Sequence, residues 1–426
     1  MLGGTMDRVP VVIAFAAAAL GGCAFLVDTA GLAGGEVAGD GGDSGAVDGH
    51  ASVEAGPTAV ADGGTRNVLL TAGGDHTCAA IDGTAYCWGR NRNGELGDGT
   101  MINAPSPVRV SGLPGPVTSI DAGERHTCAI VAGEVWCWGS AGNGTLGPGA
   151  SADSALPVKV TGLPAPALEV SAGDQFTCAL TSDGRIHCWG YNEHGRLGDG
   201  TTVSHGQPSA VVDDNGIKSD FAHVAAEADH ACGVSSAGEA FCWGHDDNGA
   251  LGNPSAGEES ARAIPVVGLP GKVERIGIGA WHACAVVAGG AFCWGTGNDG
   301  ELGNGNMTHS TAPVPVIGHG SGVSLLVAAG TSDDGDNTCA LRDGVLSCWG
   351  KGSVGRLGDG QSTTRATPAP VSGLAGGVTA LAGGACHWCA ALANGDLMCW
   401  GRGTDGQLGD GTARNRFIPT RVNLGP

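Results

Sequence analysis

Residues 72–100 read AGGDHTCAAIDGTAYCWGRNRNGELGDGT, and variants of this pattern recur to the end of the chain. The best preserved element is Cys-Trp-Gly, whose tryptophan stands at positions 88, 138, 189, 243, 294, 349 and 400. The intervals of 50, 51, 54, 51, 55 and 51 residues match the period of a single supersecondary unit. The sequence therefore predicts seven copies of one structural unit.

The first copy contains four short runs that are rich in strand-forming residues. They lie at positions 68–72, 77–81, 84–88 and 106–110, and glycine, asparagine or proline residues bound them. Four strands in each of seven repeats are typical of a propeller, in which every sheet packs against its two neighbours. We therefore expect an all-β fold over residues 67–426, a seven-bladed β-propeller of four-stranded antiparallel blades.

Each copy also contains two cysteines, nine or ten residues apart. In the first copy, a two-residue turn at Asp82-Gly83 places Cys78 opposite Cys87 in a non-hydrogen-bonded pair, where Cα atoms approach to about 4.5 Å. This distance permits a disulfide, whereas zinc sites normally need cysteines two to four residues apart. We therefore expect no metal site, and one structural disulfide within the hairpin of each blade: Cys78–Cys87, Cys128–Cys137, Cys178–Cys188, Cys232–Cys242, Cys284–Cys293, Cys339–Cys348 and Cys389–Cys399.

The N-terminal segment differs from the repeats. An apolar run at residues 9–20 ends at Leu20-Gly21-Gly22-Cys23, which resembles a bacterial lipoprotein signal. The run is shorter than the roughly 20 residues that a membrane-spanning helix needs. We expect residues 1–22 to be a lipoprotein-type signal peptide, with Cys23 lipidated as a membrane anchor in the bacterial cell envelope. An ordinary secretory signal is the alternative.

Residues 23–66 are rich in glycine, alanine and aspartate and show no apolar period, so we expect a disordered tether. After the seven pairs are assigned, Cys23 and Cys386 remain. We interpret Cys386 as a buried or unpaired thiol. Partner exchange or reactivity is the alternative, since Cys386-His387-Trp388-Cys389 has the spacing of a redox motif but not its strand-to-helix setting.

Composition narrows the classes of function. The 426 residues include 42 acidic and 21 basic side chains, giving a formal charge of −21, so the chain lacks the basic surface of a nucleic-acid-binding protein. The 16 cysteines indicate either a compartment outside the reducing cytosol or metal binding. No nucleophile with a base and orienting group, and no phosphate-binding glycine loop, is recognisable, so we expect neither an enzyme nor a cofactor.

The consensus Ala-Gly-x-x-His-Thr-Cys-Ala-Leu, Asp-Gly, Cys-Trp-Gly and Asn-x-x-Gly-x-Leu-Gly-Asp-Gly-Thr resembles the regulator of chromosome condensation repeat family. The resemblance covers all seven copies and implies the same propeller fold. It implies less about activity: the member that gives the family its name is a guanine-nucleotide exchange factor, whereas an exported bacterial member inhibits β-lactamases through its loop face. A third member, a plant ultraviolet-B photoreceptor, has a motif that residues 279–283 match only in part.

Two recurrent side chains are interpreted as structural. We expect the seven tryptophans to pack between blades. A histidine precedes the hairpin at positions 76, 126, 230, 282 and 387, with Phe176 and Asn337 in its place in the third and sixth copies. Positions that recur once per blade are too far apart for a shared metal ion, so we expect each histidine to form hydrogen bonds that hold the preceding turn.

Partner-specific chemistry is expected where the copies differ. Acidic insertions enter the fourth and sixth repeats and extend a long loop of the fourth, and they are candidates for binding a cation or a basic protein: Asp213, Asp214, Asp220, Glu258, Glu259, Asp333, Asp334 and Asp336. Solvated loops are the alternative. Glycine recurs at fixed positions of the repeat, and the two exceptions, Glu227 and Pro254, both lie in the fourth repeat.

These observations lead to one leading hypothesis and two alternatives. We expect an extracytoplasmic, lipid-anchored propeller that binds an unidentified protein as a scaffold or inhibitor. The first alternative is an enzyme with a site over the central channel. The second, which rests on fold analogy alone, is a regulator resembling a guanine-nucleotide exchange factor.

Overall fold

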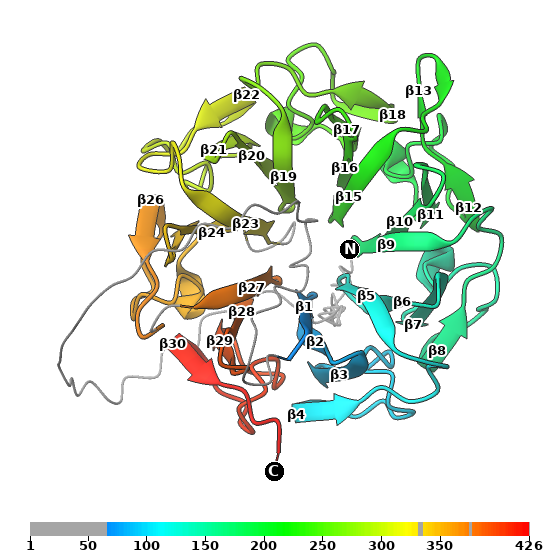
Figure 1. Cartoon of the computed structure of the whole chain (residues 1–426), viewed down its shortest axis with the longest axis vertical. Coiled ribbons are helices and arrows are strands. Elements are labelled where there is room, and N and C mark those ends of the chain that lie inside the picture. The colour runs from blue at the N-terminus through cyan, green and yellow to red at the C-terminus, as the bar shows by residue number, and fades with distance from the viewer. Residues whose placement is uncertain (1–65, 331–334, 375–376, 426) are drawn as a thin grey trace, which may run out of the picture.

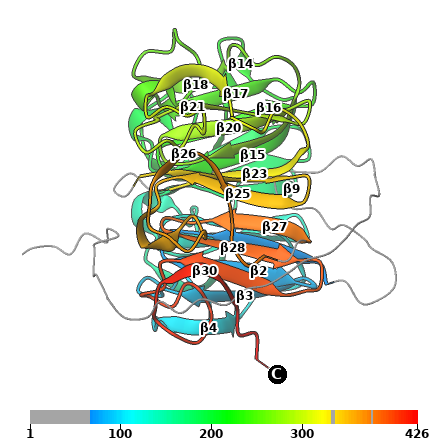
Figure 2. The ribbon, with the colours of Figure 1, turned by 90° about the vertical axis from the view of Figure 1, so that its left-hand side faces the viewer.

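The computed structural model of the chain describes residues 66–330, 335–374 and 377–425. It consists of seven four-stranded antiparallel sheets arranged around a central opening (Figure 1), and Figure 2 shows the same ring from the side. The prediction of an all-β, seven-bladed propeller is confirmed. The expected signal peptide, tether and lipidated Cys23 lie outside the described residues.

Four consecutive strands form each blade. Blade 1 contains β1 (Val68–Ala72), β2 (His76–Ile81), β3 (Thr84–Gly89) and β4 (Ala104–Arg109). Blade 2 contains β5 (Val117–Ala122), β6 (His126–Val131), β7 (Glu134–Gly139) and β8 (Ser154–Lys159). Blade 3 contains β9 (Ala167–Ala172), β10 (Phe176–Thr181), β11 (Ile186–Gly190) and β12 (His205–Ala210). Blade 4 contains β15 (Phe221–Glu227), β16 (His230–Ser235), β17 (Ala240–His245) and β18 (Glu259–Pro265).

The remaining blades repeat this order. Blade 5 contains β19 (Val273–Ile278), β20 (His282–Val287), β21 (Gly290–Gly295) and β22 (Ser310–Pro315). Blade 6 contains β23 (Val323–Ala329), β24 (Asn337–Arg342), β25 (Val345–Gly350) and β26 (Arg365–Pro370). Blade 7 contains β27 (Val378–Gly383), β28 (His387–Leu392), β29 (Leu397–Gly401) and β30 (Arg416–Arg421). The final blade therefore closes with its own four strands.

The minor elements lie in the connections. A two-stranded hairpin, β13 (Val212–Asp213) and β14 (Gly216–Ile217), joins blades 3 and 4. Short 3-10 helices follow the third strand in four blades: η1 (Gly142–Gly144), η2 (Glu193–Gly195), η3 (Asp247–Gly249) and η4 (Ser353–Gly355). Within the described residues, none of the helices has the length and apolar character needed to span a membrane.

The central hairpins have the predicted register. In blade 1, Ile81 pairs with Thr84 across a turn in which Asp82 and Gly83 have φ values of 51° and 79°, as a two-residue hairpin with the right twist requires. Cys78 opposes Cys87 and is bonded to it. All seven predicted pairs form disulfides with Cα distances of 4.0–4.1 Å, which confirms one disulfide in each blade.

The hydrophobic cores lie between neighbouring blades. Trp138 of blade 2, for example, packs in one buried cluster with Leu69, Leu96 and the Cys78–Cys87 disulfide of blade 1. The first strand of every blade lines the central channel, a narrow cavity of about 130 Å³. Because both sides of each sheet are used for packing, the side chains available to a partner are mainly those of the loops.

The loops form two faces of the ring. The first face carries the loops that join the first strand to the second and the third strand to the fourth of each blade, and we refer to it as the loop face. The opposite face carries the hairpin turns between the second and third strands, together with the connections between blades, and we refer to it as the turn face. The variable residues discussed below lie mainly on the loop face.

Candidate protein-binding surface

The side chains of the recurrent tryptophans form contacts between neighbouring blades. All seven are fully buried, and each indole nitrogen donates a hydrogen bond of 2.7–3.1 Å to a loop carbonyl of the preceding blade. Trp138, for instance, donates to the Glu95 carbonyl. The predicted inter-blade packing is confirmed, and these residues are not available to bind a partner.

The recurrent histidines also join neighbouring blades. His76 Nε2 lies 2.8 Å from Thr127 Oγ1 in the next blade, and the pairs His126–Thr177, His282–Thr338 and His387–Thr77 repeat this contact at 2.7–2.9 Å. Burial lowers the pKa of His76, His126 and His387 to about 3, so these imidazoles are neutral. The expected structural role is confirmed, but the partner is a threonine of the next blade and not the preceding turn.

The remaining three junctions lack this contact, because two of them replace both partners and one replaces the threonine alone. Phe176 packs in one apolar cluster with Ala231 of blade 4. In the amide orientation that satisfies both groups, Asn337 accepts a 3.0 Å hydrogen bond from Trp388 Nε1. At the junction of blades 4 and 5, Ala283 occupies the threonine position, and neither ring nitrogen of the buried His230 has a hydrogen-bond partner among the described residues.

Glu227 stands where the other six blades have a glycine. A Cβ atom on Gly73, Gly123 or Gly384 would lie 2.1–2.2 Å from a backbone oxygen of the neighbouring blade, so these positions need glycine. In blade 4 the loop takes another course, with Ala228 at a φ of 35°. Glu227 lines the channel cavity, and burial, followed by repulsion from other carboxylates, raises its pKa well above the usual value. The fold alone does not require a glutamate here.

The loops of blades 3 and 4 gather further charged groups beside Glu227. The Asp174 backbone nitrogen donates to the Ala228 carbonyl at 3.4 Å, which joins the two loops. Arg196 forms an ion pair with Asp229 at 2.7 Å. Asp174 Oδ1 is buried and has no hydrogen-bond partner within the described part of the chain. Burial, with repulsion from neighbouring acidic groups, raises the pKa of Asp174 to about 8.

A row of four ring-bearing residues, Tyr191, His194, His245 and Trp281, continues from this cluster across blades 3 to 5. Arg196 lies 4.7 Å from the Tyr191 ring centre. His194 stacks on His245 at 4.1 Å, and His245 meets Trp281 edge to face at 5.3 Å. All four side chains are partly exposed. We refer to these four residues as the aromatic row.

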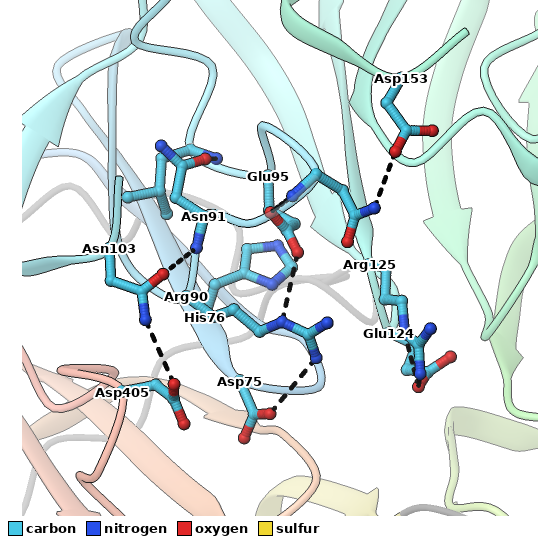
Figure 3. Close-up of polar contacts among 12 residues, drawn as sticks. Asp75, His76, Arg90, Asn91, Glu95, Asn103, Glu124, Arg125, Asp153 and Asp405 are labelled. Carbon is cyan, nitrogen blue, oxygen red and sulfur yellow. Dashed lines mark hydrogen bonds and ion pairs between the residues drawn. The ribbon is translucent and has the colours of Figure 1, made fainter. Parts of the chain in front are cut away.

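The other side of the loop face is organised by ion pairs. Arg90 lies between Asp75 and Glu95 at 3.7 Å from each, as Figure 3 shows. Arg402 of blade 7 reaches the same Asp75 at 3.3 Å. Lys351 of blade 6 pairs with Asp299 at 3.2 Å. The cations of blades 6, 7 and 1 are therefore matched by carboxylates, whereas blades 3 to 5 present the aromatic row.

Comparison with known proteins now identifies the family. The sequence matches the RCC1-like domain over residues 115–425 and the regulator of chromosome condensation (RCC1) repeat over residues 82–130. It is 31% identical over 363 residues to the ultraviolet-B receptor UVR8 of Arabidopsis thaliana, which covers 83% of this chain and 80% of UVR8. The chain belongs to the RCC1 family.

Other relatives of this RCC1-family chain agree on the fold. It is 32% identical over 239 residues to the human E3 ubiquitin-protein ligase HERC2, a match that covers 55% of the chain and only 5% of HERC2. Human WBSCR16 superposes with a TM-score of 0.70 at 22% identity, covering 80% of this chain and 93% of WBSCR16. Yeast RCC1 (Prp20), solved bound to Kap60, gives 0.69 at 20% identity with 84% of each chain covered.

The acidic residues that the sequence singled out do not form one site. Asp213, Asp214 and Asp220 lie in or beside the hairpin between blades 3 and 4, and Lys218 pairs with Asp220 at 2.8 Å. Glu258 is exposed at the end of the loop between the third and fourth strands of blade 4. Glu259, the first residue of β18, pairs with His194 at 2.8 Å. Only Glu259 therefore contacts the aromatic row.

Asp336 is not a surface acid as expected. It is 1% exposed, and it accepts hydrogen bonds from the Trp281 backbone nitrogen at 2.8 Å and from His282 Nδ1 at 2.7 Å. A buried aspartate is not accessible to a binding partner, so the prediction that Asp336 is a partner-binding residue is wrong. Asp333 and Asp334 lie outside the described residues.

The remaining cysteine is buried beside an arginine. Cys386 is 1% exposed and lies 3.3 Å from Arg356 Nη2. The expected burial of Cys386 is confirmed. None of the cysteines in the described part of the chain is a free thiol, so the alternative of an unpaired thiol is wrong. Among the described residues, no group of three or more histidine, cysteine or acidic side chains is arranged to hold a metal ion.

The aromatic row and Asp174 were missed by reasoning from the sequence, although a signal was present. The residue after Cys-Trp-Gly varies between copies, being Arg90, Ser140, Tyr191, His245, Thr296, Lys351 and Arg402. Its two ring-bearing members fall in neighbouring copies, and its three cations fall in another consecutive group. Comparison of this position around the ring would have separated the two halves of the loop face.

Proposed function

We propose that this RCC1-family propeller is an exported, lipid-anchored protein without enzymatic activity that binds a protein partner through the loop face of blades 3 to 5. One observation carries the proposal: Glu227, the exception to the recurrent glycine before the hairpin, and the partly exposed aromatic row lie together in this sector. A repeat protein whose copies share one structural consensus places partner-specific chemistry where the copies differ. Buried consensus residues, by contrast, only hold the ring together.

Two further observations support the proposal. Seven disulfides, one in each blade, suit an oxidising compartment outside the cytosol, as does the lipoprotein-like sequence that ends at Cys23. Yeast RCC1, which shares the fold, was solved with a protein bound. The channel volume of about 130 Å³ is below the roughly 300–1,000 Å³ of ordinary ligand pockets, which argues against the alternative of an enzyme over the channel.

Site-specific photo-crosslinking in the native host tests the interaction. A photoreactive amino acid replaces Tyr191 on the loop face or, as a matched control, Val345, which is 53% exposed and follows a hairpin turn on the turn face. We expect a crosslinked protein from position 191 and none from position 345. Equal crosslinking from both positions, or none from 191, would contradict the proposal.

Mass spectrometry of the chain from the same cells tests the anchor. We expect diacylglycerol on Cys23 and recovery in the membrane fraction, with release into the soluble fraction on Cys23→Ala. A Cys23 that is unmodified, or linked to Cys386 by a disulfide, in a mature chain that fractionates with soluble proteins would leave plain secretion as the explanation.

A further inference from the structure

We propose that the loop face of blades 3 to 5 recognises a cationic segment of its protein partner, with an arginine or lysine side chain held at the channel mouth by Asp174 and Glu227. The inference rests on the proposed function, because it names the chemistry of the partner at that surface. Three observations support it: a glutamate at a position where the other six blades have glycine, a buried carboxylate oxygen without a hydrogen-bond partner in the described part of the chain, and the acidic and aromatic side chains of this surface.

Glu227 has no structural counterpart in the ring. The other six blades hold a glycine at this position, and in three of them a Cβ would lie 2.1–2.2 Å from a backbone oxygen of the next blade. In blade 4 the following residue, Ala228, has a positive φ, a conformation that is unfavourable for alanine. A glutamate at a position where the other six blades have glycine, and without an ion-pair partner within the described residues, is explained by binding.

A carboxylate oxygen beside Glu227 lacks the partner that buried polar groups normally have. Asp174 Oδ1 is buried without a hydrogen-bond partner in the described part of the chain. The Asp174 backbone nitrogen donates to the Ala228 carbonyl at 3.4 Å, so this carboxylate lies on the loop next to Glu227. A ligand with several N–H donors satisfies the carboxylate oxygens, and a guanidinium or an ammonium provides them.

The acidic groups on the loop face of blades 3 to 5 favour a cationic ligand. Arg196 is committed to Asp229 at 2.7 Å and to the Ala228 carbonyl at 3.3 Å. Neither Asp174 nor Glu227 has an ion-pair partner within the described residues. Arg90, Lys351 and Arg402 of the other side of the ring are matched by their own acids, as described above. Asp174 and Glu227 therefore bring two carboxyl groups without an ion-pair partner to the junction of blades 3 and 4.

The aromatic row indicates that the cation belongs to a larger segment. Tyr191 and Trp281 offer ring faces and edges of the kind that pack on arginine and lysine side chains, and they extend across three blades, beyond the reach of a small ion. The channel cavity of about 130 Å³ is too narrow for a folded segment. A peptide lying along the row with a single cationic side chain at the mouth fits both features.

Fluorescence anisotropy with defined peptides tests the inference on the full-length chain. The probe is fluorescein-labelled hexa-arginine, and hexa-citrulline of the same shape but without charge is the ligand control. The variants are Glu227→Gly, which introduces the residue found in the other six blades, and Glu227→Gln, which removes only the charge. Asp214→Asn removes one exposed acid from the hairpin between blades 3 and 4 and is the matched control.

We expect hexa-arginine to bind the wild-type chain, hexa-citrulline not to bind, and both Glu227 variants to weaken binding at least about tenfold, as for a desolvated charge pair that loses one member. Asp214→Asn should change the affinity less than about twofold, as for an exposed charge. Equal losses in Glu227→Gln and Asp214→Asn would show non-specific attraction to an acidic protein and overturn the inference. Thermal unfolding of each variant shows whether the fold is retained.

The outcomes also separate this inference from the proposed function. If position 191 crosslinks to a protein in the host but Glu227→Gln binds hexa-arginine like the wild type, the surface binds protein by another chemistry and this inference fails alone. If no protein is crosslinked while hexa-arginine and free arginine bind through Glu227, the site takes a small cationic ligand and the inference of a protein segment fails. Wild-type binding of citrulline would overturn the role of charge.

Discussion

His387 Nε2 in the last blade lies 2.7 Å from Thr77 Oγ1 in the first blade, 310 residues earlier in the chain. Thr77 Oγ1 also lies 2.8 Å from the Gln407 carbonyl, which accepts a hydrogen bond from Trp88 Nε1 at 2.9 Å. The contact between His387 and Thr77 repeats that of three other junctions, but these two blades are not consecutive in the chain. Side-chain hydrogen bonds, a backbone hydrogen bond from the Ala385 nitrogen to the Gly73 carbonyl, and the apolar cluster around Trp88 therefore close the ring.

The first prediction concerns ring closure. Thr77→Val and Thr127→Val remove the same hydroxyl at the junction of blades 7 and 1 and at that of blades 1 and 2. Each change leaves a buried histidine nitrogen and a carbonyl with fewer partners, so we expect each to lower the free energy of unfolding by about 1 to 3 kcal/mol. Urea denaturation measures this loss.

Only the first of the two changes should open the ring. We expect faster amide hydrogen exchange in β1 and β27 for Thr77→Val, since these strands meet where the chain is not continuous, and unchanged exchange there for Thr127→Val. Exchange that rises equally in both variants would contradict closure by this contact.

The second prediction concerns His230. Ala283→Thr introduces the hydroxyl that four other junctions have, and it lies beside the Ala250 carbonyl that accepts from Trp294. By analogy with Thr127, which lies 2.8 Å from His76 and 3.0 Å from the Glu95 carbonyl, the new side chain satisfies His230. We expect the free energy of unfolding to rise by about 1 kcal/mol.

Ala231→Thr is the matched control for this change. It places the same hydroxyl opposite Phe176, which offers no hydrogen bond, so we expect it to destabilise the chain. Urea denaturation of both variants gives the comparison, and stabilisation by Ala231→Thr would show that threonine helps for a reason other than pairing with histidine.

The third prediction concerns the disulfides. Replacing Cys128 and Cys137 together by alanine removes one buried cross-link between β6 and β7. A loop of about ten residues is expected to contribute about 2 to 3 kcal/mol through the entropy of the unfolded chain. We expect a corresponding decrease in the urea midpoint, while a midpoint equal to that of the wild type would mean that the unfolded chain is already restricted by the hairpin.

The sequence was sufficient for the fold because the repeat is regular. Cys78 and Cys87 lie at positions fixed by the two-residue turn at Asp82-Gly83, and seven copies with consistent spacing leave one hairpin register. The tryptophans were recognised as inter-blade residues because a large apolar side chain recurring once per repeat has to be buried. Turn geometry and the alternation of side chains along a strand were therefore sufficient to predict the hairpins and their disulfides.

The candidate site could not be predicted in the same way, because it depends on contacts between copies. The pairing of His76 with Thr127 crosses 51 positions, so the partner of each histidine was assigned to the wrong element. The burial of Asp336 depends on His282, 54 positions away. Glu227 was visible as an exception to the glycine pattern, but its closeness to Asp174 follows only from the packing of adjacent loops.

The fourth prediction concerns the pH dependence of cation binding. The pKa of Asp174 is raised to about 8 by burial, with repulsion from Glu124 and Asp229 outweighing the attraction of Arg196 and Arg125. The pKa of Glu227 is raised well above its usual value by burial, with repulsion from Asp174, Asp121 and Asp336. Asp174 is therefore largely protonated near neutral pH. A bound guanidinium requires both carboxyls to be ionised, so protons compete with the cation for this site.

It follows that hexa-arginine should bind more tightly as the pH rises from 7 to 9, because the probe keeps its charge over this range and fewer protons need to be displaced. Titration calorimetry at pH 7.5 in phosphate and in Tris, whose ionisation enthalpies differ, should show proton release on binding. Asp174→Asn together with Glu227→Gln should abolish both the release and the pH dependence. An affinity that stays constant or falls between pH 7 and 9 would place the cation away from these two carboxyls.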